Sequence, residues 1–188
     1  SRFKPKQCAK RISDFIADPS ADIRAAACEY LGEIAADGFK EAIQKCLNDN
    51  IWHVRMQAVI TLEKMFGAKS IADIAPLLKD SHWLLRERVK EIMIKHFSES
   101  LVFIERFLLG KDQDVKQTCV EIMDKSGYRN KILNDIVSGD IETQDKAQVW
   151  LKTIIKADAH FGLERILSKY SPDMRLKILN AVASVDKD

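Results

Sequence analysis

The stretch DPSADIRAAACEYLGEI, residues 18–34, decides the fold because it recurs along the chain. Related stretches are DNIWHVRMQAVITLEKM from Asp49, DSHWLLRERVKEIMIKH from Asp80, GKDQDVKQTCVEIMDKS from Gly110, a degenerate copy from Gly139 and YSPDMRLKILNAVASV from Tyr170. The successive spacings are 31, 31, 30, 29 and 31 residues. A fixed period of this size is typical of a solenoid, in which each unit buries its apolar face only against its neighbours. Such chains build surfaces and seldom carry chemistry of their own.

Each repeat predicts two helices, of which the second is the clearer. In the first repeat, one apolar stripe of a 3.6-residue helix consists of Ile23, Ala27, Tyr30, Leu31 and Ile34. Residues that favour the start of a helix lie between the stripes, at Asp49-Asn50, Asp80-Ser81 and Ser171-Pro172-Asp173. Glycines that favour the end of a helix lie at Gly38, Gly67 and Gly127.

These features predict an all-α protein, a right-handed α-solenoid of about six antiparallel helix-turn-helix repeats. Apolar residues make up 46% of the chain, which is enough for a continuous core. We expect one domain over residues 1–188, with approximate repeats at 5–37, 38–67, 68–98, 99–127, 128–157 and 158–186.

The composition excludes several classes of protein. The chain has no apolar run of about 18 residues and no signal peptide, so we expect neither a membrane span nor secretion. It begins without Met, and we expect it to be part of a longer protein. The four cysteines, Cys8, Cys28, Cys46 and Cys119, form no C-x-x-C pair and lie in helical patterns. This usage indicates a reducing, cytoplasmic location with neither disulfides nor a zinc site.

The repeat pattern Asp-x(4)-Val/Ile/Leu-Arg-x-x-Ala-x-x-x-Leu resembles the HEAT-like repeats of the phycobilisome-lyase type. Asp18-Ile23-Arg24-Ala27-Leu31 matches it, as do Asp49-Val54-Arg55-Ala58-Leu62 and, with Val89 for Ala, Asp80-Leu85-Arg86-Met93. The fourth repeat keeps Val115 and Lys116 but has Gly110 in place of the Asp, so the resemblance covers residues 18–125 best. It implies the solenoid fold, and the family includes chromophore lyases, chaperones, scaffolds and regulatory domains.

The Arg and Asp residues of this pattern form a ladder: Asp18, Arg24, Asp49, Arg55, Asp80 and Arg86. A row of basic residues could bind phosphate groups. By helical angle, however, these residues flank the apolar stripe, and in HEAT-like repeats the basic residue ties its helix to the Asp of the same or a neighbouring repeat. We therefore interpret the ladder as structural.

Two tryptophans, Trp52 and Trp83, occupy the same position in adjacent repeats, and their indoles are expected to lie side by side. Packing is the favoured interpretation, and a ligand-binding aromatic shelf is the alternative. Trp150 is expected in the core of the degenerate fifth repeat. The histidines His53, His82, His96 and His160 share no face at ligand spacing, and no catalytic or phosphate-loop motif is present. No catalytic residue, metal ligand or cofactor is therefore predicted.

The side of the second helices opposite the stripe is the most informative surface. It carries several acids and an apolar patch, and in HEAT-like solenoids it lines the concave face. The residues predicted to bind a partner there are Glu29, Met56, Ile60, Glu63, Glu87, Glu91, Ile94 and Glu121. Apolar residues framed by charge suit a protein interface, whereas an acidic face disfavours nucleic acid.

We expect a non-enzymatic scaffold or regulatory domain that binds a basic, amphipathic segment of another protein on this acidic concave face. One alternative, implied by the resemblance, is a lyase- or chaperone-like component with Trp52 and Trp83 as the walls of a chromophore or cofactor pocket. Another is a cytoplasmic regulatory domain of a membrane protein, suggested by the basic residues between Arg2 and Arg11. That segment fits equally well as a capping helix, since Cys8, Ile12, Phe15 and Ile16 follow a helical stripe, and we favour this use. The sequence gives no indication of an oligomeric state.

Overall fold

A computed structural model describes residues 10–34, 37–157 and 167–184 of the chain. Every regular element among these residues is helical, which confirms the all-α prediction, and the fold class is an α-solenoid. The α-helices are α2 (Ala21–Glu33), α3 (Lys40–Cys46), α4 (Trp52–Phe66), α5 (Ile71–Ile74), α6 (Trp83–Lys95), α7 (Phe97–Leu108), α8 (Gln113–Lys125), α9 (Tyr128–Ser138), α10 (Ile141–Ala157) and α12 (Pro172–Ala183). Short 3-10 helices are η1 (Asp14–Ala17), η2 (Asp37–Phe39), η3 (Gly67–Ser70) and η4 (Ala75–Lys79).

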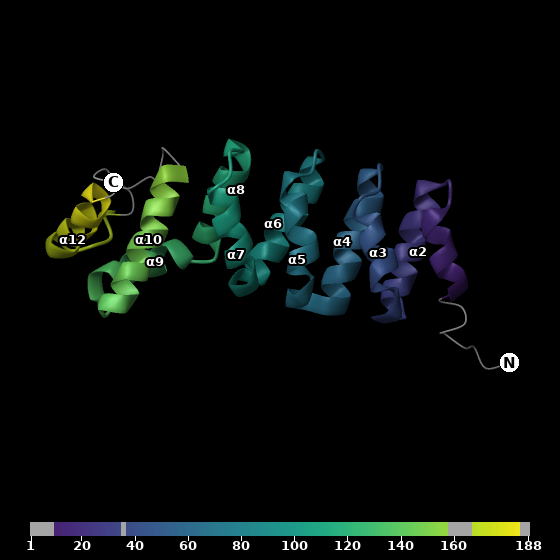
Figure 1. The fold of residues 1–188 in the computed structure, drawn as a ribbon, viewed down its shortest axis with the longest axis horizontal. Helices are drawn as coiled ribbons and strands as arrows, with labels where there is room; N and C mark the ends of the chain where they lie inside the picture. The colour runs from purple at the N-terminus through teal and green to yellow at the C-terminus, as the bar shows by residue number, and fades with distance from the viewer. Residues whose placement is uncertain (1–9, 35–36, 158–166, 185–188) are drawn as a thin grey trace. The chain divides into compact units, whose positions relative to one another are not determined.

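The chain divides into two compact units, unit 1 comprising residues 1–100 and unit 2 residues 101–188. Within unit 1, α2, α4 and α6 pack side by side in chain order, as can be followed in Figure 1. The shorter elements pack against them: η1 on α2, α3 on α4, and η4 on α6. Unit 1 therefore has two layers, and each expected second helix, α2, α4 or α6, lies beside its counterpart in the next repeat. One domain with six repeats remains a prediction.

The apolar stripe forms much of the core of unit 1. Leu31, Leu62 and Val89 are completely buried. Ile23, in contrast, is 43% exposed, although its counterparts Val54 and Leu85 are buried. The reason is its place in the array, because among the described residues only the short segment 10–20 precedes α2. The stripe therefore predicts burial only where a preceding repeat covers it.

Glycine and proline set three of the helix boundaries. Gly67 ends α4 with a φ of +51°, and Gly127, between α8 and α9, has a φ of +76°, a region that side chains disfavour. The expected first helix of the third repeat is divided into α5 and η4, because Pro76 at the start of η4 has no N–H to donate to the preceding turn. Its apolar residues Ile71, Ile74 and Leu78 are nevertheless buried as expected.

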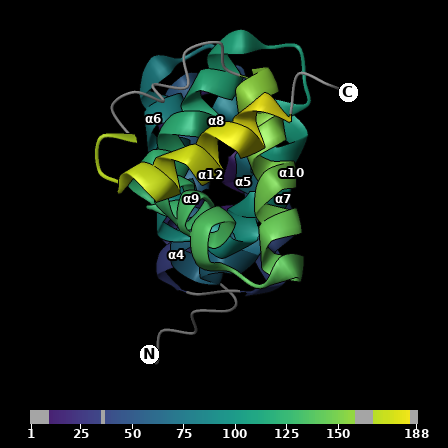
Figure 2. The same ribbon diagram turned by 90° about the vertical axis from the view of Figure 1, so that its left-hand side faces the viewer.

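Unit 2 is built from the remaining helices. α9 packs against α8 and α10, and α12 contacts both α9 and α10. Figure 2 looks onto this end of unit 2, where α12 lies nearest to the viewer. Its core includes Cys119, Leu133, Leu151 and Ile178, all completely buried.

An arginine–aspartate ladder joins the repeats of unit 1. Arg24 donates from Nε and Nη2 to both carboxylate oxygens of Asp49, at 2.6 and 2.8 Å, and Arg55 does the same to Asp80, at 2.7 and 2.7 Å. Each guanidinium also reaches back to its own repeat, since Arg24 donates to the backbone oxygen of Asp18 and Arg55 to that of Asp49. Such bidentate, charge-assisted pairs are geometrically specific. The ladder therefore fixes the register of each repeat on the next.

Each aspartate also orders the start of its own second helix. Asp49 accepts the backbone N–H of Ile51 at 2.9 Å, and Asp80 accepts that of His82 at 2.8 Å. The hydrogen bond from Arg24 holds the pKa of Asp49 below its ordinary value. Burial acts to raise the pKa of Asp80, but the hydrogen bonds from Arg55 and the His82 N–H outweigh it and lower the pKa. Both carboxylates are therefore stabilised in their charged form.

The ladder ends at Arg86. Its guanidinium donates to the backbone oxygens of Asp80 and Ser81, at 2.8 and 3.1 Å, and among the described residues it has no carboxylate partner. Gly110 stands where the next repeat would supply the aspartate. The nearby Asp112 instead accepts the N–H of Val115 and caps α8.

Replacing Asp80 by Asn should lower the free energy of unfolding by on the order of 2 kcal/mol at pH 7, because hydrogen bonds to a charged group are lost. The folded pKa of Asp80 is depressed. Its stabilisation is therefore fully present above the unfolded pKa of about 3.9 and disappears as the pH falls through the folded pKa. Denaturant titrations of both proteins should show the difference shrinking below about pH 4. Asp145→Asn, at an exposed position of α10, serves as the control, and a pH-independent difference would contradict the assignment.

α2 and α4 approach each other closely at Gly32. A Cβ added at this buried glycine would lie 2.7 Å from Cγ2 of Thr61, whose hydroxyl is in turn 3.5 Å from the backbone oxygen of Cys28. Gly32→Ala should therefore destabilise the protein by about 1–3 kcal/mol through overpacking. Thermal or denaturant unfolding measures this loss.

The matched variants distinguish this contact from helix propensity. Thr61→Ser removes the methyl group and keeps the hydroxyl, so the Gly32→Ala, Thr61→Ser double variant should regain part of the loss. Gly38→Ala is the control, because a Cβ there meets nothing within 4 Å. Additive losses in the double variant would show that the two positions do not contact each other.

Candidate functional site

The outer side of α2, α4 and α6, away from the layer formed by η1, α3 and η4, is the first candidate site; we call it the second-helix face. Met56 and Ile60 lie on it one turn apart on α4 and are half-buried. At the start of α6, Trp83 is 60% exposed and Leu84 is also exposed. Large apolar side chains at the surface of a folded unit suit the contact surface of a partner.

The acidic residues of this face are partly neutralised by neighbours on the same helix. Glu87 pairs with Lys90 at 2.7 Å, and Glu91 pairs with Arg88 at 3.1 Å. Glu29, on α2, is exposed and forms no hydrogen bond or ion pair with a described residue. Ion pairs therefore make the face less negative than the number of its acidic residues suggests.

Two further acids link neighbouring repeats. Glu63 accepts from Lys95 at 2.6 Å and lies 3.3 Å from Nε2 of His96, and Lys64 pairs with Glu33 of the preceding repeat. The side chain of Glu63 is only 12% exposed. The hydrogen bond from Lys95, aided by His96 and opposed by burial, holds the pKa of Glu63 below its ordinary value. Glu63 therefore joins two repeats and is not a free acid at the surface.

Trp52 belongs to a row of contacts along the amino-terminal ends of the second helices. Its indole stacks on the imidazole of His82, with ring centroids 3.8 Å apart and planes 1° from parallel. His53 meets Trp52 edge-on at 6.0 Å, and its Nε2 lies 3.4 Å from Oδ1 of Asp22 on α2. The two indoles predicted to lie side by side thus form no stacked pair. Side chains lean toward the amino terminus of their helix, which brings the Trp52 ring to the residue before Trp83.

The other predicted partner-binding residues lie at different places. Ile94 is half-buried on α6. Glu121 is half-buried on α8 and belongs to unit 2, so it is described separately from the face in unit 1. The basic residues Arg2, Lys4 and Lys6, together with Cys8 and His160, lie outside the described residues.

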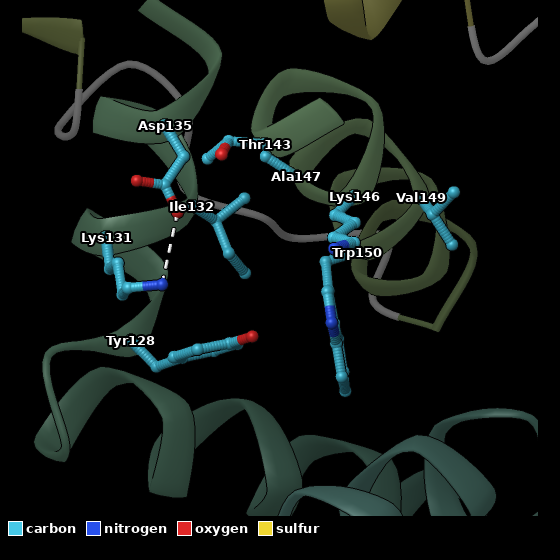
Figure 3. Close-up of a pocket in the computed structure, with 9 residues that line it drawn as sticks. All are labelled: Tyr128, Lys131, Ile132, Asp135, Thr143, Lys146, Ala147, Val149 and Trp150. Atoms are coloured by element: carbon cyan, nitrogen blue, oxygen red, sulfur yellow. Dashed lines mark hydrogen bonds and ion pairs between the residues drawn. The ribbon is translucent and has the colours of Figure 1, made fainter. Parts of the chain in front are cut away.

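A cleft in unit 2 is the second candidate site. α9 and α10 border an open cleft of about 390 Å³, shown in Figure 3, lined by Tyr128, Lys131, Ile132, Asp135, Thr143, Lys146, Ala147, Val149 and Trp150. The Tyr128 and Trp150 rings meet edge-on with centroids 5.7 Å apart. Trp150 is half-buried and lines this cleft, where the sequence had predicted a core position. One signal was available, since Tyr128, Lys131 and Asp135 recur at helical spacing on one side of α9.

The described part of the chain offers neither a membrane span nor a metal site. None of its helices is both long enough and apolar enough to span a bilayer. Nor does any group of three or more His, Cys, Asp or Glu side chains in residues 10–34, 37–157 and 167–184 have an arrangement that could hold a metal ion.

Comparison with known proteins identifies the repeats. The family model of HEAT repeats matches residues 9–93. This stretch of the chain consists of HEAT repeats. The matched residues contain the whole arginine–aspartate ladder and most of the second-helix face. HEAT repeats generally serve as scaffolds for protein interactions, using the extended surface that stacked helices create.

Other comparisons add little to this result. No curated protein matches the chain. One solved structure that matches the chain is the crystal structure of an engineered protein from the Northeast Structural Genomics Consortium. It is 15% identical, with 95% of this chain and 96% of that chain covered and a TM-score of 0.39.

The different surroundings of Trp52 and Trp83 can be measured by fluorescence quenching. Two single-tryptophan proteins are needed, one keeping Trp83 (Trp52→Phe, Trp150→Phe) and one keeping Trp52 (Trp83→Phe, Trp150→Phe). Acrylamide should quench Trp83 with the larger Stern–Volmer constant, because that indole is exposed whereas Trp52 is covered by His82. Equal constants in the two folded proteins would contradict the stacked arrangement.

Proposed function

We propose that this protein is a non-enzymatic scaffold whose second-helix face binds a basic, amphipathic helical segment of another protein. The observation that carries this proposal is the apolar group formed by the half-buried Met56 and Ile60 and the exposed Trp83 among acidic residues. An amphipathic helix is recognised by such a combination, because apolar anchors spaced by one turn enter a groove while charges flank it.

The apolar side chains would supply most of the binding energy. Trp83 has the features of an interface hot spot, since tryptophan offers a large rigid contact area and is enriched among residues that dominate binding. Met56 is unbranched and adapts its shape to different partners. The described residues of unit 1 do not fully cover these side chains. A bound partner would bury their remaining apolar surface and so remove it from water.

The acidic residues of the face would favour a partner segment that carries positive charge. Glu29 is exposed and unpaired among the described residues, and the Glu91–Arg88 pair is exposed. Surface ion pairs contribute only about 0–1 kcal/mol, so a basic partner could replace Arg88 as the neighbour of Glu91 at little cost. Glu63 is excluded from this role because Lys95 and His96 already occupy it.

The two alternative functions lack a supporting observation of this kind. A chromophore pocket walled by Trp52 and Trp83 would need the face of Trp52 that His82 covers. A membrane-associated role rests on the basic segment at the start of the chain, most of which lies outside the described residues. Both remain predictions from the sequence.

The proposal can be tested with synthetic peptides of about 18 residues that carry Leu at i, i+3, i+4 and i+7 and Lys or Arg elsewhere. The basic peptide should bind, and raising the salt from about 50 to about 300 mM should weaken binding, as measured by fluorescence anisotropy. Met56→Ser with Ile60→Ser should weaken binding about tenfold, equivalent to 1.4 kcal/mol. Glu29→Lys with Glu91→Lys should weaken it and flatten the salt dependence.

The controls distinguish binding at the second-helix face from non-specific binding of the peptide. Leu176→Ser with Leu179→Ser removes two exposed apolar side chains from α12 in unit 2 and should leave the affinity unchanged. A peptide with Glu in place of each basic residue, and one with the same composition in shuffled order, should not bind. Equal affinity of the acidic peptide, or no effect of the Met56 and Ile60 changes, would overturn the proposal.

A further inference from the structure

We propose that the cleft between α9 and α10 of unit 2 is a binding site for a small aromatic carboxylate. The site involves no residue of the second-helix face, so the inference stands independently of the proposed scaffold function. Its volume of about 390 Å³ lies within the range of small-molecule sites, about 300–1,000 Å³. Protein interiors are otherwise closely packed, and a space of this size between two packed helices is available to a ligand.

Aromatic rings form one side of the cleft. Tyr128 and Trp150 meet at an interplanar angle of 86°, so they present two differently oriented surfaces to the space beside them, as Figure 3 shows. Ile132 points into the same space, and Ala147 lies opposite it on α10. Edge-to-face and offset contacts with aromatic rings are each worth about 0.5–1.5 kcal/mol beyond burial. These walls favour a planar ring.

Two lysines supply ammonium groups to the lining of the cleft. Lys131 projects from α9 and lies 3.3 Å from Asp135, and Lys146 projects from α10 and lies 2.6 Å from Glu142. Their side chains are 65% and 72% exposed. Exposed pairs of this kind are weak, so either ammonium can turn to a bound anion at little cost. Each lysine has one carboxylate partner, and a ligand with a single negative charge would replace one of these partners.

Tyr128 adds a neutral hydrogen-bond donor. Its ring is half-buried, and its hydroxyl points across the cleft toward Trp150 in Figure 3. Desolvation raises the pKa of Tyr128, so the hydroxyl stays protonated at neutral pH and can donate to a carboxylate oxygen. Lys131 also lies 5.6 Å from the centre of the Tyr128 ring, which keeps a positive charge beside this donor.

The test uses indole-3-carboxylate as the probe and ¹⁵N-labelled full-length protein. Each tryptophan gives one indole N–H resonance, and Trp150→Phe assigns the resonance in the cleft. Titration should shift the Trp150 resonance and leave those of Trp52 and Trp83 unmoved, with a Kd on the order of 1 mM or tighter for a ligand of this size. Uncharged indole and acetate alone should each bind at least about fivefold more weakly, a difference of about 1 kcal/mol.

Lysine variants provide the matched comparison. Lys131→Gln with Lys146→Gln should weaken the binding of indole-3-carboxylate about fivefold or more. Lys111→Gln with Lys156→Gln changes two exposed lysines that do not line the cleft, and it should leave the affinity unchanged. Unchanged thermal unfolding checks that each variant folds. The proposal is overturned by any of three results: an unmoved Trp150 resonance at 10-fold excess over the expected Kd, equal affinity for indole and indole-3-carboxylate, or unchanged affinity in the Lys131 and Lys146 variant.

Discussion

The bidentate pairing of each arginine with the aspartate of the following repeat is the interaction on which the rest of unit 1 depends. Arg24 binds Asp49 and Arg55 binds Asp80, while the same aspartates order the first turn of their own helices. One carboxylate therefore fixes both the start of a helix and the register between two repeats. The helices of successive repeats are thereby held side by side with their outer surface uncovered. The match to HEAT repeats ends at residue 93, shortly after the last arginine of the ladder.

Pairing of charges also decides what the uncovered surface can do. Most of its acids are neutralised by lysine, arginine or histidine, either on the same helix or, for Glu33 and Glu63, from the next repeat. The half-buried Met56 and Ile60 of α4 and the exposed Trp83 of α6 thus become the larger part of the proposed recognition surface. The cleft in unit 2 has the opposite character, with two lysines beside two aromatic rings. The two proposed sites therefore differ in chemistry: we propose an apolar and basic partner for the face in unit 1 and an aromatic anion for the cleft in unit 2.

Much of the fold could be predicted from the sequence because a helix is specified by local spacing. The repeat of about 31 residues identified the second helices, and the apolar stripe identified buried residues such as Leu31, Leu62 and Val89. The stripe was misleading at Ile23, where the position in the array and not the residue type determines exposure. The site was predicted less well. The apolar residues predicted there, Met56, Ile60 and Ile94, are half-buried, and the count of acids overstated the charge of the face.

What the sequence alone determined was the helical class, the period and the set of residues facing inward, since all of these follow from spacing along one helix. Only the tertiary structure decided which groups meet across repeats: Lys95 with Glu63, the Trp52 ring with His82, and Tyr128 with Trp150 beside an open cleft. These contacts join residues about 22–32 positions apart. They depend on the rise and rotation between successive helices and on the direction in which each side chain leans. Spacing within one repeat does not specify either quantity, and therefore the sites are properties of the packed structure.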